Sequence, residues 1–165
     1  MKHTFFVIFI NLLLLVSCKS NKLTCYDYES SIVEVGTQGA AVIKAWGEGK
    51  TIEAAKIDAK RNAVYSILFK GFPTANGINS TDLRPMITNP NAERQYKDFF
   101  ENFFSDKGKF NQYVQYVDDQ GRLALGDAVR TSKGYKVAVV VVVNKRALRL
   151  EMEYQGIIQK FGINY

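Results

Sequence analysis

The chain has 165 residues, of which 47% are hydrophobic and 13% aromatic, and its formal net charge is +6. This size and composition are enough for one ordinary domain with a packed core. The charges are interspersed, which is typical of a solvated surface and does not predict nucleic-acid binding. A site for acidic glycans or lipid head groups is the alternative explanation of the basic excess. The one histidine is His3, so removal of the N-terminal segment excludes histidine triads and imidazole zinc sites.

The N-terminal segment has the pattern of a secretory signal. A short basic start, Met1–Thr4, precedes the run Phe5–Val16, which is apolar except for Asn11. A transmembrane helix needs about 20 apolar residues, and this shorter run fits the core of a signal peptide better. The run ends in Leu15-Val16-Ser17-Cys18.

This ending resembles the lipobox of bacterial lipoproteins. The resemblance implies that residues 1–17 are a signal peptide, and that Cys18 carries diacylglycerol on its sulfur and usually an acyl group on its new amino group. Two or more acyl chains hold a protein stably on a membrane. The alternative is a plain secretory signal with an incidental cysteine. Cys18 is the predicted lipidation site, and the membrane is the predicted partner of its acyl chains.

The residues after Cys18 indicate to which membrane the lipoprotein would be sorted. Residue 19 is Lys rather than Asp, and residues 19–22 contain no acidic residue. For a lipoprotein, this implies the periplasmic face of the outer membrane. We expect residues 18–30 to form a lipidated tether and residues 31–165 a single domain. Cys25 is the one cysteine left after lipidation, so no intramolecular disulfide is expected.

The first elements of the domain are an extended segment and a helix. Residues 32–46 favour extended chain broken by glycines, and Gly47–Lys50 predicts a turn. Thr51 is a good N-cap for a helix that Gly71 ends, and Glu53 favours the dipole at its start. Small residues in a stripe allow a helix to lie close to a sheet. The stripe consists of Ala55, Ala59 and Ala63.

A long loop and a second helix follow. Residues 72–90 contain all three prolines of the chain, and structureless loops of this length are often functional or mobile. Asn91 is the expected cap of a helix over residues 92–105. Its aromatic stripe is interpreted as core rather than as a ligand site. The stripe consists of Tyr96, Phe99, Phe100, Phe103 and Phe104.

The C-terminal part predicts a meander and a last helix. Residues 110–117, 122–130 and 135–144 read as antiparallel strands separated by turns. Asn144 is the expected cap of a helix over residues 145–155 that buries Leu148, Leu150 and Met152 in part. The run 137–143 lacks polar alternation, which predicts cover on both faces. The helices, the 72–90 loop, a second copy or a partner are the candidate covers.

Together these elements predict an α+β fold, with an antiparallel sheet of about four strands and three helices packed on it. The predicted order is β-α-α-β-β-β-α.

One stretch carries a further resemblance. Residues 39–71 read GAAVIKAWGEGKTIEAAKIDAKRNAVYSILFKG, a glycine-containing strand followed by an alanine-rich helix with Arg61-Asn62-Ala63 in its middle. The stretch resembles the small bacterial lipoprotein family typified by the twenty-kilodalton lipoprotein antigen, and the N-terminal domain of a flagellar-assembly periplasmic protein. The resemblance implies an α+β envelope module without known catalysis. It assigns no site residues.

The leading functional prediction is a non-catalytic lipoprotein module that binds another envelope protein or a second copy of itself. The alternative is a ligand-binding lipoprotein, in which the 72–90 loop closes over a small molecule or glycan near Trp46, Tyr113 and Tyr116. An envelope hydrolase using carboxylates comes third, because no spacing among the carboxylates selects a pair. No catalytic residue, metal ligand or cofactor is predicted.

Overall fold

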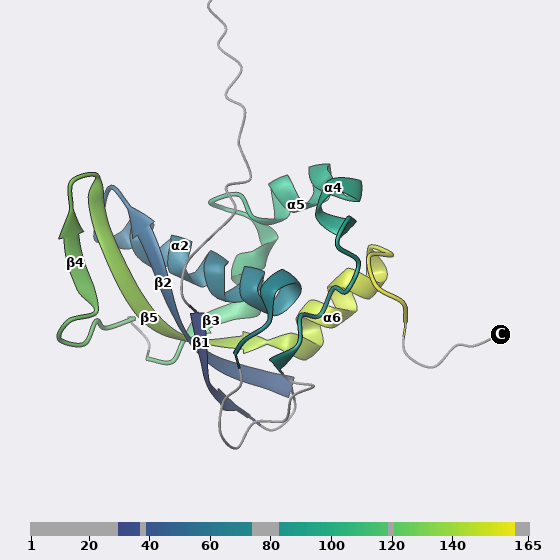
Figure 1. The fold of residues 1–165 in the computed structure, drawn as a ribbon, viewed down its shortest axis with the longest axis horizontal. Helices are drawn as coiled ribbons and strands as arrows, with labels where there is room; N and C mark the ends of the chain where they lie inside the picture. Colours follow the sequence, from purple (N-terminus) through teal and green to yellow (C-terminus); the bar gives the residue numbers. More distant parts are fainter. Residues whose placement is uncertain (1–29, 37–38, 74–82, 119–120, 161–165) are drawn as a thin grey trace, which may run out of the picture.

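A computed structural model of the protein describes residues 30–36, 39–73, 83–118 and 121–160. Figure 1 shows a curled antiparallel sheet of five strands with helices packed on it, which confirms the predicted α+β class. The elements in chain order are β1 (Ser30–Val35), β2 (Ala40–Gly49), α2 (Ile52–Tyr65), the π-helix η2 (Ser66–Lys70), α4 (Ala92–Gln95), α5 (Lys97–Phe103), the 3₁₀ helix η3 (Lys109–Tyr113), β3 (Val114–Tyr116), β4 (Ala128–Thr131), β5 (Gly134–Asn144) and α6 (Lys145–Tyr154).

Strand β5 lies in the centre of the sheet. It pairs with β2 along its whole length on one side. On its other side, β4 pairs with Gly134–Val137 and β3 pairs with Val141–Val143. The edge strand β1 pairs with Ala41–Ala45 of β2. Within the described residues, β2 therefore has no strand neighbour on that side beyond Ala45, and its backbone polar groups there need other partners.

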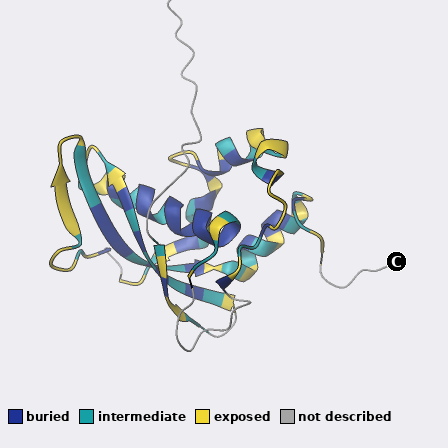
Figure 2. Ribbon diagram, viewed as in Figure 1, coloured by how far each residue is buried: buried dark blue, intermediate teal, exposed yellow. Residues whose placement is uncertain are grey.

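The two faces of β5 differ in burial. The side chains of Val137, Val139, Val141 and Val143 face the helices and are buried, whereas Val140 and Val142 on the opposite face are half-buried (Figure 2). The valine run predicted full cover on both faces. In the described residues the second face is covered in part, because its β2 neighbours include the long side chains of Lys44 and Trp46.

Helix α2 lies close against β2, as its alanine stripe predicted. Ala55, Ala59 and Ala63 are each fully buried. The strand contributes a complementary gap, because a Cβ atom added at Gly47 would lie 2.2 Å from the backbone nitrogen of Ala59. The prediction of a turn at residues 47–50 is therefore wrong for Gly47 and Gly49, which belong to β2 and leave room for the helix.

Helix α2 begins and ends as the sequence predicted. The Thr51 hydroxyl accepts a hydrogen bond from the Ala54 amide at 3.1 Å. The last turns widen into η2, and Gly71 ends the helix with φ of +71°. A side chain at Gly71 would also collide with the Leu83 carbonyl oxygen, 2.4 Å from its Cβ position.

The aromatic segment forms core, but it is not one helix. It divides into α4 and α5 at Tyr96, whose backbone is non-helical and whose hydroxyl donates to the Gly156 carbonyl at 2.9 Å. Asn91 stands at the N-cap position, yet its side chain accepts from Arg94 rather than from a backbone amide. Phe100, Phe103 and Phe104 are buried. The Phe104 ring packs with Tyr65 and the Phe100 ring with Phe69 of the first helical segment.

The predicted strand lengths differ from those observed. Residues 30–35 and 40–49 form two paired antiparallel strands, β1 and β2, rather than one interrupted strand. In the segment 110–117, β3 spans Val114–Tyr116, because the preceding residues coil into η3 and bury Phe110. In the segment 122–130, β4 begins at Ala128. Before it, a turn joins the Asp127 amide to the Ala124 carbonyl at 3.0 Å.

Helix α6 begins at the predicted cap, where Asn144 Oδ1 accepts from the Ala147 amide at 2.9 Å. Leu148 and Met152 are fully buried. Leu150 is 59% exposed, so its predicted burial is wrong. It lies two positions after Leu148 and therefore on another side of the helix.

Candidate functional site

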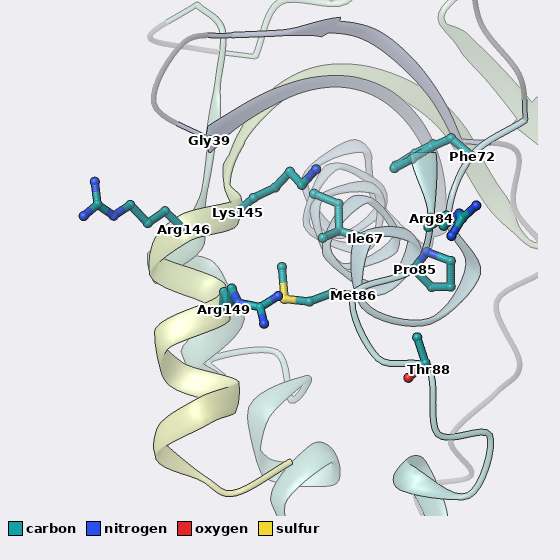
Figure 3. Close-up of a pocket in the computed structure, with 10 residues that line it drawn as sticks. All are labelled: Gly39, Ile67, Phe72, Arg84, Pro85, Met86, Thr88, Lys145, Arg146 and Arg149. Atoms are coloured by element: carbon teal, nitrogen blue, oxygen red, sulfur yellow. The ribbon is translucent and has the colours of Figure 1, made fainter. Parts of the chain in front are cut away.

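A cavity of about 550 Å³ lies between α6, the end of the first helix and the segment 84–88 (Figure 3). Its volume is within the usual range of small-molecule sites, roughly 300–1,000 Å³. The uncharged residues that line it are Gly39, Ile67, Phe72, Pro85, Met86 and Thr88. The charged residues that line it are Arg84, Lys145, Arg146 and Arg149.

The apolar wall is fixed by backbone hydrogen bonds at the end of the first helix. The last carbonyl groups of a helix lack partners within it. Here the amides of Met86 and Ile87 donate to the carbonyls of Ile67 and Leu68, at 2.8 and 2.9 Å. The Phe72 amide also donates to the Leu83 carbonyl at 2.7 Å. Residues 83–87 are therefore held against η2, and their side chains form a defined wall.

The charged residues come from both sides of the cavity. Figure 3 shows the side chains of Lys145 and Arg149 reaching from α6 toward Ile67 and Met86, whereas Arg146 points away from the cavity. Arg84 lies on the opposite wall beside Pro85. Arg149 forms an ion pair with Glu153 of its own helix at 2.9 Å. Among the described lining residues four are basic, and there is no aspartate or glutamate.

The charge at the start of α6 runs against the helix dipole. The N-terminus of a helix carries partial positive charge and favours acidic side chains in the first turn. In α6 the first residues are Lys145 and Arg146, and no acidic residue stands in the first turn. These cations reduce the stability of their own helix, and such local conflicts are typical of functional sites.

The polar side chains that reach the cavity could bind an anion. They are Arg84, Lys145, Arg149 and the Thr88 hydroxyl, whereas Arg146 lines the cavity but its side chain points away. Cations with an apolar wall can hold an anion and exclude water, but acid–base catalysis needs a group that gives or takes a proton near neutral pH. No group of three or more potential metal-ligating side chains (His, Cys, Asp or Glu) occurs among the residues that the structure describes.

The three aromatic residues proposed from the sequence as ligand contacts do not meet at one site. Trp46 pairs with Ala138 on the half-buried face of the sheet, where Lys136 Nζ lies 5.4 Å from its ring. Tyr116 pairs with Val141 and therefore lies on the opposite face, with Lys60 Nζ 5.2 Å from its ring. None of Trp46, Tyr113 and Tyr116 lines the cavity.

Tyr113 belongs to a cluster around the buried carboxylate of Glu151. Lys109 Nζ donates to both Glu151 oxygens at 2.8 Å, and the Tyr113 hydroxyl donates to Oε2 at 3.1 Å. Burial raises the pKa of Glu151, but the hydrogen bonds from Lys109, Gln155 and Tyr113 outweigh it and hold this pKa below its usual range. Burial, together with the Glu151 charge, raises the pKa of Tyr113 to about 12. The cluster joins α6 to η3.

A second buried cluster accounts for the Arg61-Asn62 pair in the alanine-rich helix. The Asp58 carboxylate accepts from the Glu48 amide and from Arg61, both at 2.9 Å. Asn62 Nδ2 donates to the Trp46 carbonyl at 2.8 Å. These side chains form hydrogen bonds with backbone groups of β2 in the part of the strand that does not pair with β1. Burial raises the pKa of Asp58 despite these bonds.

The predicted lipidation site, Cys18, lies outside the described residues, as does Cys25. Among the residues that the structure does describe, no helix combines the length and the apolar character needed to span a bilayer. Comparison with known proteins gives no match: no family model, curated protein or solved structure is similar enough to this chain to place it in a family.

Sequence reasoning missed the cavity, although one signal was present. Residues 145–149 read KRALR, which puts basic side chains directly after a helix cap. The helix dipole disfavours this arrangement, so the pattern indicated that these residues serve something other than helix stability. Their apolar counterparts, Ile67 and Met86, are brought to the same place by the hydrogen bonds between η2 and the segment 83–87.

Proposed function

We propose that the protein is a non-catalytic, membrane-anchored lipoprotein of the cell envelope, whose folded domain binds a ligand in the cavity beside α6. Acyl chains on Cys18 attach it to the periplasmic face of the outer membrane. The observation that carries the binding role is the cavity of about 550 Å³, with four basic residues and no acidic residue among its described lining. The resemblance of residues 39–71 to a family of small envelope lipoproteins agrees with this proposal.

The buried carboxylates support binding rather than catalysis. Perturbed pKa values often indicate catalytic groups, but structural networks also produce them. Asp58 accepts a hydrogen bond from the β2 backbone, and Glu151 accepts hydrogen bonds that join α6 to η3. Each carboxylate thus has a structural task that explains its burial.

The anchor is tested by replacing each cysteine in turn. Cys18→Ala is expected to abolish labelling by a fatty-acid analogue and attachment to membranes, because it removes the acylation site. Cys25→Ala is the matched control and should label and pellet with membranes like the wild type. Continued labelling of the Cys18→Ala variant would show that the lipobox assignment is wrong.

The binding role is tested by filling the cavity. Thr88 is exposed and lines the cavity, so Thr88→Trp adds bulk there without entering the core. The full chain is isolated in patches of its own membrane, and the small molecules released on denaturation are compared by mass spectrometry. A molecule enriched with the wild type should be depleted at least tenfold in Thr88→Trp and retained in the control, Thr131→Trp. Equal amounts in all three samples would contradict the proposal.

The half-buried face of the sheet supports a second candidate, an assembly module that binds a second copy or another envelope protein. Val140 and Val142 are half-buried, and Val129, paired with Lys136 on this face, is 50% exposed. Val140→Lys should leave a folded protein that no longer crosslinks to itself. Val141→Lys should unfold, because Val141 is fully buried on the helix side and a buried unpaired charge is strongly destabilising. Unchanged crosslinking of Val140→Lys would exclude this face as the contact between copies.

A further inference from the structure

We propose that the ligand of the cavity is an anionic amphiphile, a molecule with a carboxylate or phosphate head joined to an apolar chain. This inference rests on the proposed binding function and names its ligand class. The two halves of such a molecule correspond to the two kinds of lining residue. The apolar ones come from the end of the first helix and the segment 84–88, and the basic ones come from α6 and from Arg84 on the opposite wall (Figure 3).

The apolar half of the ligand would contact the wall formed by Ile67, Phe72, Pro85 and Met86. Ile67 is buried in the core and Phe72 and Met86 are half-buried, so the wall continues the hydrophobic core to the surface. Each Å² of apolar surface removed from water contributes roughly 25 cal/mol. A ligand that is purely ionic, such as inorganic phosphate, would leave this wall in contact with water.

The anionic half would lie between α6 and the opposite wall. Lys145 and Arg149 are one helical turn apart, and their side chains extend on the same side of α6 into the cavity (Figure 3). Arg84 lies on the opposite wall beside Pro85 and is exposed. Arginine and lysine form short, charge-assisted hydrogen bonds with carboxylates and phosphates. A neutral apolar ligand would remove water from these side chains without offering them such hydrogen bonds, which is unfavourable.

The α6 terminus adds to this charge. The backbone at the start of a helix carries partial positive charge, and Lys145 and Arg146 stand in the first turn without an acidic neighbour there. An anion bound beside Lys145 would relieve the repulsion between the helix dipole and these side chains. The cavity and its apolar wall carry the proposal, and the helix terminus strengthens it.

The methionines of the chain supply a direct test. Of the three, Met86 lines the cavity and Met152 is fully buried in the core, while Met1 lies in the predicted signal peptide. The full chain is prepared in nanodiscs of zwitterionic phosphatidylcholine with ¹³C-labelled methionine methyl groups. Octyl phosphate should shift the Met86 signal saturably and leave the Met152 signal in place.

Two further probes separate the halves of the ligand. Octanol has the chain without the charge, and inorganic phosphate has the charge without the chain. Both are expected to bind at least tenfold more weakly than octyl phosphate. If octanol binds as tightly, the anionic assignment is overturned while the cavity remains a binding site. If inorganic phosphate binds as tightly, the amphiphilic assignment is overturned. If none of the probes shifts the Met86 signal, the proposed binding role is overturned as well.

Matched variants test the cations themselves. Lys145→Gln and Arg84→Gln should each weaken octyl phosphate binding on the order of tenfold, because each removes a charge-assisted hydrogen bond to the phosphate. Lys133→Gln and Arg130→Gln change the same residue types on the exposed β4–β5 hairpin and should leave binding unchanged. The Met152 signal reports whether each variant is folded. If the folded cavity variants and the folded hairpin variants bind octyl phosphate with equal affinity, the proposal is overturned.

The source of the amphiphile is distinguished by the membrane used. In nanodiscs of anionic phosphatidylglycerol, a site for membrane lipid head groups would show the Met86 signal already at its bound position, and octyl phosphate would add nothing. A site for a free amphiphile would show the same Met86 signal in both membranes until octyl phosphate is added. Both results support the shared chemistry of an anionic head and an apolar chain.

Discussion

Helices α2 and α6 both place charged side chains against the rest of the protein, but with opposite outcomes. On α2, Asp58, Arg61 and Asn62 are buried, and they bond to one another and to the backbone of β2. On α6, Arg149 forms an ion pair with Glu153, and the side chains of Lys145 and Arg149 extend toward a cavity whose described lining residues include no aspartate or glutamate (Figure 3). The first helix lies against its strand with no room for a Cβ atom at Gly47, whereas the second borders about 550 Å³ of open space.

We interpret the difference as one between a structural cluster and a proposed binding site. A buried polar group without a partner is destabilising, so clusters that serve the fold satisfy their members internally. A binding site leaves charge and space for the ligand to complement. Most polar atoms of the α2 cluster are bonded within the fold, although Arg61 Nε and Asn62 Oδ1 have no hydrogen-bond partner among the described residues. The α6 cavity is the proposed ligand site. Changes to the α2 region should therefore affect stability, and changes to the α6 cavity should affect binding.

The largest expected effect is at Asp58. Asp58→Ala removes the partner of a buried guanidinium and of the Glu48 amide. Breaking a buried ion pair from one side typically costs about 3–5 kcal/mol, and we expect a loss of this size in the free energy of unfolding, measured by thermal or urea denaturation.

Asp106 supplies the control for this prediction. It contacts the same Arg61, at 2.7 Å, but its side chain is 91% exposed. Exposed ion pairs contribute about 0–1 kcal/mol, so Asp106→Ala should be nearly neutral. Comparable losses in the two variants would show that the α2 cluster does not depend on its buried carboxylate.

A smaller effect is expected from overpacking the contact between α2 and β2. Ala59→Leu places a larger side chain where Ala59 is fully buried and its backbone borders Gly47. Overpacking typically costs about 1–3 kcal/mol. Ala54 is exposed on the same helix, and Ala54→Leu should change the free energy of unfolding by no more than about 0.5 kcal/mol. Equal melting temperatures would mean that the helix lies less closely on the sheet than described.

The smallest effect is expected at the start of α6 and has the opposite sign. Arg146→Glu replaces a cation that points away from the cavity with an acidic residue in the first turn. The helix dipole should then stabilise the protein by about 0.3–1 kcal/mol, seen as a higher melting temperature. Octyl phosphate affinity should fall less than in Lys145→Gln. A lower melting temperature would contradict the dipole argument.

The sequence predicted the fold correctly mainly where a cap residue or a periodic pattern of side chains sets the local structure. Thr51, Gly71 and Asn144 set helix boundaries that the structure confirms. The alanine stripe identified the face of α2 that lies on the sheet, and the aromatic stripe of residues 96–104 identified core. The break between α4 and α5 at Tyr96 could not be predicted from the sequence, because Tyr96 is hydrogen-bonded to Gly156, which is distant in the chain.

The candidate site was less readable than the fold. The aromatic residues chosen from the sequence, Trp46 and Tyr116, lie on opposite faces of the sheet, because strand pairing decides which side chains meet. The 72–90 loop does contribute to the cavity, through its residues Phe72, Arg84–Met86 and Thr88. Helix α6 lies across the cavity from these residues, and its position there follows from how the last helix packs on the domain.

By itself, the sequence determined the α+β class and the caps and faces of helices α2 and α6, since each follows from side-chain chemistry within a few residues. The central place of the valine strand came from the strand pairing. Only the tertiary structure decided that Gly47 and Gly49 belong to a strand beneath α2, that Asp58 and Asn62 bond the free edge of that strand, and that Lys145 and Arg149 face Ile67 and Met86 across a cavity. These features join residues distant in the chain, and their positions depend on how whole elements pack, which local preference does not specify.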